Sequence, residues 1–351
     1  MAIPTQHALI VAGPGRLEHH ADVPRPSAGA NEVLIRVSAV ALNPVDNKAA
    51  ELSPATGAIA GCDFSGTVHQ ASNNDNKLAP GQRVCGLVFQ DPAEHLHNGA
   101  FAEWVVADPD FLLRVPPAMS TEEAASLGIG LATCGLALYH ELALPRPSAP
   151  SSVSRPVLVY GASTATGTLA LQLLRLSGLQ PVAICSARNF DLARSRGAAM
   201  TFDYHDPECG EAVRELTGDS IECALDCITT SESMSVCYRA IGSKGGRYLA
   251  LDQYSLRQHT RRAVKPRWIL ANTMSGKPVA WKGAYRREAK PRDREFIASW
   301  FRECQQLLDG GTIQPHPLKV LRGGLGEVLR GLQELKEGRL SGQKIVCSLT
   351  V

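Results

Sequence analysis

The pattern of hydrophobic and polar residues divides the chain into two parts of different texture. Up to about residue 119, short apolar runs such as 33–41, 61–68 and 84–89 are interrupted by Gly, Pro and Asn. This pattern predicts an irregular all-β domain. Beyond residue 126, short buried-type strands alternate with helical segments, and we expect the strands at 157–160, 182–185, 201–204, 221–225 and 247–251. Strands at this spacing predict βαβ units and a parallel sheet.

Two further segments have a clear local pattern. The stretch 145–156 is rich in Pro and Ser and has no periodicity, which predicts a surface loop before the first parallel strand. Near the C-terminal end, large apolar side chains recur at helical intervals and stop at Gly310-Gly311; they are Phe296, Trp300, Phe301, Cys304, Leu307 and Leu308. We interpret this stripe as the buried face of a helix with a glycine at its end, rather than as a cofactor contact.

The composition is that of a folded globular chain with little attraction for nucleic acid. Its 351 residues are enough for two compact domains. Hydrophobic residues make up 44% and charged residues 20%, which argues against long disorder. The 36 Lys and Arg residues against 34 Asp and Glu leave a formal charge of +2, too even for a protein that binds phosphate backbones.

The cysteines and the hydrophobic segments indicate the cellular compartment of the protein. The ten cysteines are scattered without a Cys-x-x-Cys, so we expect reduced, buried thiols. The N-terminal segment lacks the basic region and apolar core of a signal peptide. The most hydrophobic segment, 127–139, is shorter than the roughly 20 residues that span a bilayer. We therefore expect a cytoplasmic protein without a membrane segment.

A candidate nucleotide-binding turn follows the first expected parallel strand. The sequence from Val157 through Gly161 to Gly167 predicts a strand, a turn of small residues and a helix, whose first amides can hold a pyrophosphate. Ser163 and Thr166 stand where G-x-G-x-x-G has its second and third glycines, so the motif alone is weak. The hydroxyls of Ser163 and Thr164 are candidate phosphate donors, and an ordinary strand-to-helix turn is the alternative.

The end of the second parallel strand favours NADP over NAD. The segment Ser186–Asn189 has no acid where an NAD enzyme places Asp or Glu on the ribose. Its hydroxyl, guanidinium and amide suit the 2′-phosphate of NADP. Asp191, the nearest acid, is interpreted as a first-turn helix residue. Tyr204 is a candidate for stacking on the adenine, or else a core tyrosine, and Leu251–Asp252 end the fifth strand at the same rim.

Several segments together carry a family resemblance; they are Asn43–Lys48, Gly61–Gly66, Gly99–Glu103, the Gly161 turn, Cys185–Asp191, Trp281–Tyr285 and Ser341–Val346. Over nearly its whole length the chain resembles the medium-chain dehydrogenase/reductase superfamily. Within it, the chain is similar to the trans-acting enoyl reductases of fungal polyketide synthases, of the lovastatin type. The resemblance implies an α/β fold, with a GroES-like β domain at 1–125 completed by 276–351. A Rossmann domain with a doubly wound parallel sheet is then expected at 126–275.

The same resemblance implies the site residues. NADP(H) is expected to contact Val45, Asp46, Asn47, Lys48, Ser163, Thr164, Ala165, Thr166, Ser186, Ala187, Arg188, Asn189, Tyr204, Leu251, Asp252, Ser341 and Gly342. The acyl substrate is expected to contact Ala132, Thr133, Cys134, Gly135, Leu136, Ala137, Leu138, Tyr139, Leu270, Ala271, Asn272, Thr273 and Met274.

No metal is expected. A catalytic zinc needs three Cys, His or carboxylate ligands and an open position. The places that match the zinc-binding relatives instead read Asn43-Pro-Val-Asp46 and Gly61-Cys62-Asp63. Four closely spaced cysteines, as in a structural-zinc lobe, are absent from 89–103. His95 and His97 are interpreted as a solvated loop pair.

The expected function is that of a trans-acting enoyl reductase, which uses NADPH to reduce an α,β-unsaturated acyl thioester. Hydride passes to the β-carbon, the thioester carbonyl takes up the developing charge, and a donor or water protonates the α-carbon. Lys48 is the leading catalytic candidate. Thr133 and Asn272 are secondary candidates for orienting the thioester, and capping or core polar roles are their alternatives.

The expected partner is a polyketide synthase, or a polyketide synthase–peptide synthetase hybrid, with its acyl carrier protein. The basic run 257–267 is either a docking face for an acidic carrier domain, a solvated face, or a contact for cofactor phosphates. We expect a monomer. Two other functions stay open: a zinc-independent quinone or alkene oxidoreductase acting on free small molecules, and a non-catalytic NADPH-binding subunit of a synthase.

Overall fold

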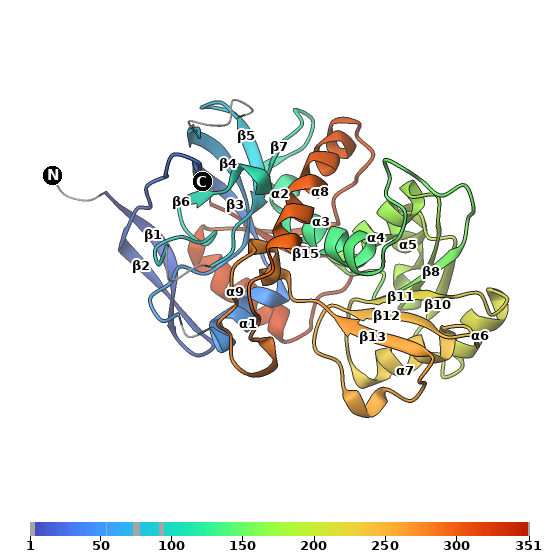
Figure 1. Ribbon diagram of the computed structural model, residues 1–351. Coiled ribbons are helices and arrows are strands. Elements are labelled where there is room, and N and C mark those ends of the chain that lie inside the picture. Colours follow the sequence, from blue (N-terminus) through green and yellow to red (C-terminus); the bar gives the residue numbers. More distant parts are fainter. Residues whose placement is uncertain (1–3, 54, 73–77, 91–94, 350–351) are drawn as a thin grey trace. The chain divides into compact units, whose positions relative to one another are not determined.

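A computed structural model describes residues 4–53, 55–72, 78–90 and 95–349 (Figure 1). The chain forms two compact units, of which unit 1 comprises 1–129 and 272–351 and unit 2 comprises 130–271. These boundaries lie a few residues from those expected on sequence. Residues 1–3, and residues 91–94 within the segment searched for a structural-zinc lobe, lie outside the described residues.

Unit 1 is built on β-structure, as its interrupted apolar runs predict. Its main sheet has the strand order β14-β15-β3-β4-β5-β7, with β6 also paired to β3, and a separate hairpin joins β1 and β2. The strands are β1 Thr5–Gly13, β2 Arg16–Pro24, β3 Val33–Ala41, β4 Asp63–Gln70, β5 Arg83–Leu87, β6 Trp104–Ala107, β7 Leu112–Arg114, β14 Leu318–Arg322 and β15 Lys344–Ser348. The strand β15 pairs antiparallel with β3, so a late segment of the chain is an inner strand of this sheet.

Helices complete unit 1; they are α1 Pro44–Leu52, α2 Thr121–Ala125, α8 Pro291–Asp309 and α9 Leu325–Lys336. The predicted apolar helix is α8, which ends at Gly310. Its stripe is buried, with Trp300, Phe301 and Cys304 at most 2% exposed. The interpretation of this stripe as core is therefore confirmed.

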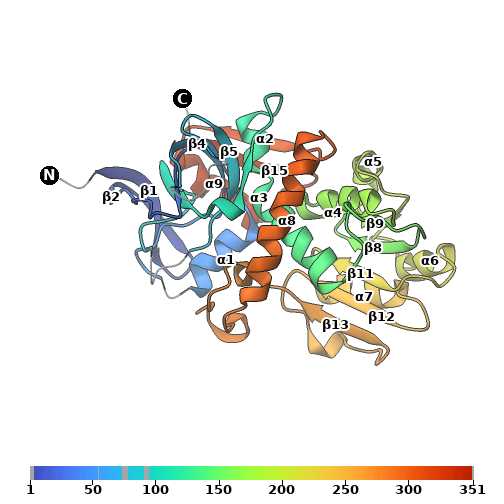
Figure 2. The ribbon, with the colours of Figure 1, turned by 45° about the horizontal axis from the view of Figure 1, so that its top comes forward.

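Unit 2 contains the predicted parallel sheet, with the order β10-β9-β8-β11-β12-β13. The strands are β8 Pro156–Tyr160, β9 Gln180–Cys185, β10 Met200–Asp203, β11 Cys223–Asp226, β12 Gly246–Ala250 and β13 Val264–Trp268. The helices are α4 Ala165–Leu176, α5 Phe190–Ser195, α6 Cys209–Leu216 and α7 Ser231–Ala240. Figure 2 shows α4 and α5 on one face of the sheet and α6 and α7 on the other. The strand order reverses between β8 and β11, where open α/β sheets bind their ligands.

A rare helical form follows the boundary between the units. The helix α3 covers Gly128–Cys134 and continues as a π-helix over Gly135–Glu141. Such π-helical turns are uncommon and occur frequently at functional sites. The hydrophobic run at 127–139 is thus helical and buried within the protein fold. None of the described helices is both long and apolar enough to cross a membrane.

One arginine of the basic run 257–267 is structural. The guanidinium of Arg261 donates to the carbonyl oxygens of Tyr238, Ile241 and Gly242 at 2.6–2.7 Å, at the C-terminal end of α7. A cation at this place satisfies carbonyls that have no partner within the helix. The expectation that the whole run is a docking or solvated face is therefore wrong for Arg261.

The cysteines are as expected. All ten are free thiols, and nine are buried, with Cys227 partly exposed.

Candidate active site

A buried ionic network joins the strands β4 and β15 of unit 1 to the start of α1. The ammonium of Lys344, at the start of β15, donates to Asp63 Oδ2 and to Asn43 Oδ1, each at 2.8 Å. Asn43 Nδ2 donates to the same Asp63 oxygen at 2.9 Å, and the main-chain amide of Ile129 donates to Asp63 Oδ1 at 2.6 Å. Lys344 and Asp63 are 5% and 0% exposed. Their charges compensate each other where water is excluded, so removing either one leaves the other unpaired.

Asp46 extends this network into α1. Its Oδ2 accepts the main-chain N–H of Asn43 at 2.7 Å, and Cys62 Sγ donates to its Oδ1 at 3.4 Å. Burial raises the pKa of Asp46 to about 7, against the hydrogen bond from Asn43, and the charge of Asp63 raises it further. Burial also raises the pKa of the Cys62 thiol well above its usual value, which keeps this sulfur unreactive.

The network fixes the helix that carries Lys48. Asn43 is the N-cap of α1 and Pro44 its first residue, a position that suits proline. Asn47 Nδ2 donates to the carbonyl of Leu332 in α9 at 3.2 Å, and Lys48 is half-buried one residue further on. Asp46 is one of the cofactor contacts predicted in this helix. Its carboxyl group is held in the network, so only the main chain of Asp46 stays a candidate for contact with the cofactor.

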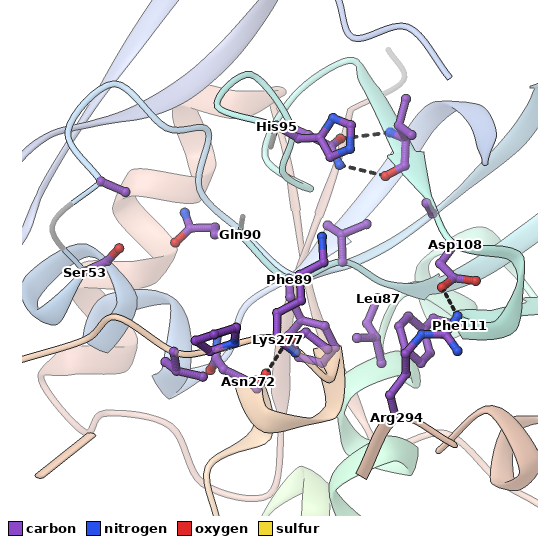
Figure 3. A pocket seen from close by; sticks show the side chains of 18 of the residues that line it. Ser53, Leu87, Phe89, Gln90, His95, Asp108, Phe111, Asn272, Lys277 and Arg294 are labelled. Carbon is purple, nitrogen blue, oxygen red and sulfur yellow. Dashed lines mark hydrogen bonds and ion pairs between the residues drawn. The ribbon is translucent and has the colours of Figure 1, made fainter. Parts of the chain in front are cut away.

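Unit 1 also contains a cavity of about 450 Å³ (Figure 3). Leu87, Val88 and Phe89, which end and follow β5, form part of its apolar wall together with Phe111. Polar groups complete the lining, including the ion pair of Arg294 with Asp108 and the contact between His95 Nε2 and Glu32 Oε1 at 3.3 Å. The remaining lining residues are Ser53, Ala55, Gln90, Asn98, Val106, Ala107, Asn272, Ser275, Lys277, Pro278, Val279, Ala280 and Trp281.

Only one of the predicted substrate residues of unit 1 lines this cavity. It is Asn272, which lies in a 3-10 turn, Ala271–Ser275, with its Oδ1 buried and without a hydrogen-bond partner among the described residues. Thr273 donates its hydroxyl to the buried Asp293 at 2.6 Å, and Met274 is fully buried. The side chains of these two residues hold the turn in place. Leu270 and Ala271 belong to unit 2.

In unit 2, the predicted nucleotide-binding turn has the required local geometry. Gly161 has a φ of +72°, and a Cβ on Gly167 would lie 2.3 Å from the Gly161 carbonyl oxygen. Thr164 is the N-cap of α4, and its hydroxyl oxygen accepts the Gly167 N–H at 2.9 Å. Ser163, Ala165 and Thr166 are half-buried at this turn. Only glycines fit the two tight positions, so the turn brings the first amides of a twelve-residue helix to its surface.

The polar groups predicted for the 2′-phosphate gather beside this turn. Asn189 Nδ2 donates to Ser163 Oγ at 3.2 Å and to Ser186 Oγ at 3.1 Å, which links the ends of β8 and β9. Ala187 and Arg188 are exposed. Asp191 lies in the first turn of α5, with its side chain fully exposed and paired to Arg194 at 3.5 Å. The interpretation of Asp191 as a first-turn residue is confirmed.

The sequence analysis missed an acid at this rim. Asp203 ends β10, beside the end of β9, and accepts the main-chain N–H of His205 at 3.0 Å and its Nδ1 at 2.7 Å. These contacts, the main-chain one first, lower the pKa of Asp203. The sequence feature that could have revealed Asp203 is its place at the end of an expected parallel strand, immediately before Tyr204. Tyr204 itself is 42% exposed, so its interpretation as a core tyrosine is wrong and the adenine contact stays a prediction.

The other predicted rim residues differ in exposure. Leu251 and Asp252 are partly exposed directly after β12, and Asp252 accepts the N–H of Gln253 at 2.8 Å. Ser341 is exposed, and Gly342 has a φ of +63° in the turn before β15.

The predicted substrate segment 132–139 is almost wholly buried. Tyr139 is 6% exposed, and its hydroxyl lies 3.3 Å from the carbonyl oxygen of Leu173 and 3.0 Å from Ser177 Oγ. Cys134 Sγ donates to the Thr166 carbonyl oxygen at 3.4 Å. Thr133 alone among these eight residues keeps partial exposure. Thr133 therefore stays a candidate for substrate contact through its side chain. The other seven residues are packed in the interior; they are Ala132, Cys134, Gly135, Leu136, Ala137, Leu138 and Tyr139.

Two family descriptions match the chain. Residues 29–117 match the alcohol dehydrogenase GroES-like domain, and residues 165–251 match the zinc-binding dehydrogenase family. These matches fall in unit 1 and unit 2, respectively, and confirm the predicted fold class.

Relatives of the same length are similar over the whole chain. A trans-enoyl reductase of Penicillium oxalicum, opdC, is 43% identical over 98% of this chain and 97% of its own. The Aspergillus niger trans-enoyl reductase caaB is 45% identical, again over 98% of this chain and 97% of its own. Among solved structures, the CurK enoyl reductase has a TM-score of 0.76 at 18% identity over 99% of this chain and 100% of its own. A quinone oxidoreductase of Pseudomonas syringae has a TM-score of 0.74 at 17% identity, over 98% of this chain and 100% of its own. Both structures support the fold.

The residues present do not fit the zinc ion of the second family description. At the places where the resemblance implies zinc ligands, this chain has Asn43, Cys62 and Asp63, and the Lys344 ammonium already lies 2.8 Å from the Asp63 carboxylate. A second cation at that carboxylate would be repelled at close range in a buried site. Within the described ranges, no three His, Cys, Asp or Glu side chains are grouped so as to hold a metal.

We expect Lys344→Met to lower the free energy of unfolding by about 3–5 kcal/mol, because it leaves the Asp63 carboxylate buried without its cation. Urea denaturation monitored by tryptophan fluorescence measures the loss. Lys319→Met is the matched control. Lys319 lies on the neighbouring strand β14 and forms a partly exposed ion pair with Glu334 of α9, which is worth at most about 1 kcal/mol. The double variant Lys344→Met/Asp63→Asn should recover at least half of the loss; equal losses in Lys344→Met and the control would contradict this account.

We also expect Asp46 to make stability fall as the pH rises. The folded chain keeps the Asp46 proton up to about pH 7, whereas the unfolded chain releases it near 3.8, so between these values only the folded state is protonated. Relative to Asp46→Asn, the wild-type free energy of unfolding should decrease by about 1 kcal/mol per pH unit across this range and level off above it. Urea denaturation of both proteins at each pH isolates this difference. A difference that does not change between pH 4 and pH 7 would show that Asp46 ionises normally.

Proposed function

This chain belongs to the trans-enoyl reductases of the medium-chain dehydrogenase/reductase superfamily, and from this we propose that it reduces the α,β-double bond of an unsaturated acyl thioester. The acyl chain is carried by a polyketide synthase or a hybrid synthase, and the hydride donor is NADPH. The observation that carries the proposal is the identity of 43–45% with trans-enoyl reductases over nearly the full length of both chains.

The residues that follow the strands β8, β9 and β10 of unit 2 support NADP(H) as the cofactor. The amides at the start of α4, with the hydroxyls of Ser163 and Thr166, suit the pyrophosphate. The exposed guanidinium of Arg188, beside Ser186 and Asn189, suits the additional 2′-phosphate. The acid at the same rim, Asp203, has its carboxylate engaged by His205. Tyr204 offers an exposed ring for the adenine. The cofactor, when bound, supplies the hydride.

The remaining catalytic task falls to groups that hold the thioester and its developing charge. When the β-carbon gains hydride, negative charge builds up on the thioester oxygen, and a proton must reach the α-carbon. Lys48, on the helix α1 that the buried network fixes, is the proposed donor to that oxygen. Asn272 and Thr133 are the proposed orienting groups, because each keeps a polar side chain at a lining or partly exposed position.

The experiment that tests this function follows the oxidation of NADPH by the purified protein with a crotonyl-pantetheine thioester. Parallel reactions replace the thioester by a quinone, or NADPH by NADH. Turnover of the thioester with NADPH supports the enoyl reductase. Turnover of the quinone alone would assign the protein to the quinone reductases, and NADPH binding without turnover of either substrate would make it a non-catalytic subunit.

We expect Arg188→Ala to raise KM for NADPH at least tenfold, because it removes a charge-assisted contact worth on the order of 1.5–3 kcal/mol. KM for NADH should change less than twofold. Asp191→Ala, three residues along the chain and fully exposed, is the matched control and should leave both constants unchanged. An equal rise of KM for both cofactors would remove Arg188 from phosphate recognition.

We expect Lys48→Ala to lower kcat with the crotonyl thioester by a factor of about 10² to 10³, the usual effect of losing one donor to a developing oxyanion. The dissociation constant of NADPH, measured by fluorescence titration, should stay within about threefold of that of the wild type if the main role of Lys48 is in the chemical step. Unchanged turnover would remove Lys48 from the mechanism. A loss confined to NADPH binding would make Lys48 a cofactor residue only.

A further inference from the structure

A strongly basic segment follows the predicted substrate turn of unit 1. Residues 277–294 contain seven Lys or Arg and two acidic residues, a net charge of +5. Because the whole chain carries +2, all other residues together carry –3. The run 257–267 has the same net charge of +5, so the two basic segments have to be distinguished by their surroundings.

Residues 277–290 form a loop and residues 291–294 begin α8, and the cations of this segment differ in exposure. Val279 and Arg287 form an antiparallel bridge, with main-chain hydrogen bonds of 2.9 and 3.0 Å. The Lys282 N–H donates to the carbonyl of Leu52, the last residue of α1, at 3.1 Å. Val279 and Trp281 are buried and hold the loop in place, whereas Lys282, Arg286 and Arg292 are exposed. The exposed cations thus have fixed positions on a rigid support, which favours recognition of a defined partner.

The same segment borders the cavity of unit 1. Lys277, Pro278 and Ala280 line the cavity and are at the same time exposed, so this part of the loop lies at an opening of the cavity. Figure 3 shows Lys277 and Arg294 among the side chains that line the cavity, together with Leu87, Phe89 and Phe111. A thiol-bound acyl chain is apolar, whereas the pantetheine arm ends in a phosphate on a carrier domain that is commonly acidic. The apolar wall formed by Leu87, Phe89 and Phe111 suits the acyl chain, and the exposed cations near the opening suit the phosphate.

The other basic run, 257–267, offers less free charge. Arg261 is committed to the end of α7, and Arg267 is paired with Glu141 at 3.1 Å. Both belong to unit 2, whereas the segment 277–294 is adjacent to a described cavity. Both segments carry a net charge of +5, so it is the neighbouring cavity that favours the loop in unit 1.

We propose that the basic loop 277–294 is the surface on which an acidic acyl carrier domain docks, with its pantetheine phosphate and acidic helices facing Lys282, Arg286 and Arg292. The inference rests on the proposed reduction of carrier-bound thioesters and adds the place where the carrier binds. Electrostatic complementarity of this kind raises the association rate and makes binding salt-dependent.

The test compares two triple charge reversals. Lys282→Glu/Arg286→Glu/Arg292→Glu changes the loop, and Arg257→Glu/Arg262→Glu/Lys265→Glu is the matched control in unit 2; none of these residues has a place in the proposed catalytic or cofactor machinery. Each protein is assayed with crotonyl-pantetheine and with a crotonyl-loaded acyl carrier domain of a fungal polyketide synthase. Binding of the same carrier domain, without turnover, is measured by fluorescence anisotropy at low and high salt. Thermal unfolding checks that each variant is folded.

For the loop variant we expect kcat/KM with the carrier-bound substrate and the affinity for the carrier domain to fall at least tenfold, and the salt dependence of binding to decrease. Its kcat/KM with crotonyl-pantetheine should stay within twofold of the wild type, and the control variant should behave like the wild type throughout. Unchanged carrier binding in the loop variant, or a loss that occurs only in the control variant, would overturn the proposal. So would equal losses with both substrates, or a wild type that does not bind the carrier at all. A wild type that binds the carrier through this loop but reduces neither thioester would overturn the proposed function and leave the docking surface standing.

Discussion

The buried pair of Lys344 and Asp63 is the interaction on which the organisation of unit 1 depends. It joins residues 281 positions apart, and through Asn43 it also fixes the start of α1. One ammonium therefore aligns β15 with β3 and β4 and positions the helix that carries Lys48. The same ammonium lies 2.8 Å from the Asp63 carboxylate and compensates its charge in the interior.

The parts of the fold that could be predicted from sequence are those with a local hydrophobic signal. The strands β8 to β12 are short apolar runs between turns, and α8 has an uninterrupted stripe that ends at glycine. The nucleotide-binding turn was recognisable because Gly161 and Gly167 occupy positions that exclude a Cβ. The family resemblance added the discontinuous domain, which no local pattern reveals, and the comparisons confirm the fold and the family.

The rest depends on contacts between distant residues or on which way a side chain faces. Nothing in the sequence around Lys344 distinguishes it from a surface lysine, and the count of charges that singled out 257–267 did not reveal that Arg261 satisfies helix carbonyls. Likewise, the resemblance assigned a continuous stretch from Ala132 to Tyr139 to the substrate, whereas a helical segment exposes only part of its circumference. Because the other residues of that stretch are buried, only Thr133 stays a candidate for substrate contact. The cavity of unit 1 arises from several separate parts of the chain and has no signature in any one of them.

The discontinuity of unit 1 has a consequence for its biogenesis. Because residues 272–351 follow the whole of unit 2, the ribosome completes the parallel sheet of unit 2 before it makes β14, α9 and β15. Until β15 arrives, the edge of β3 that pairs with Val346, Cys347 and Ser348 is open, and the Asp63 carboxylate lacks its cation. An open strand edge is a template for wrong pairing, so the nascent chain passes through an aggregation-prone interval that lasts from the synthesis of β3 to that of β15 and includes the translation of all of unit 2.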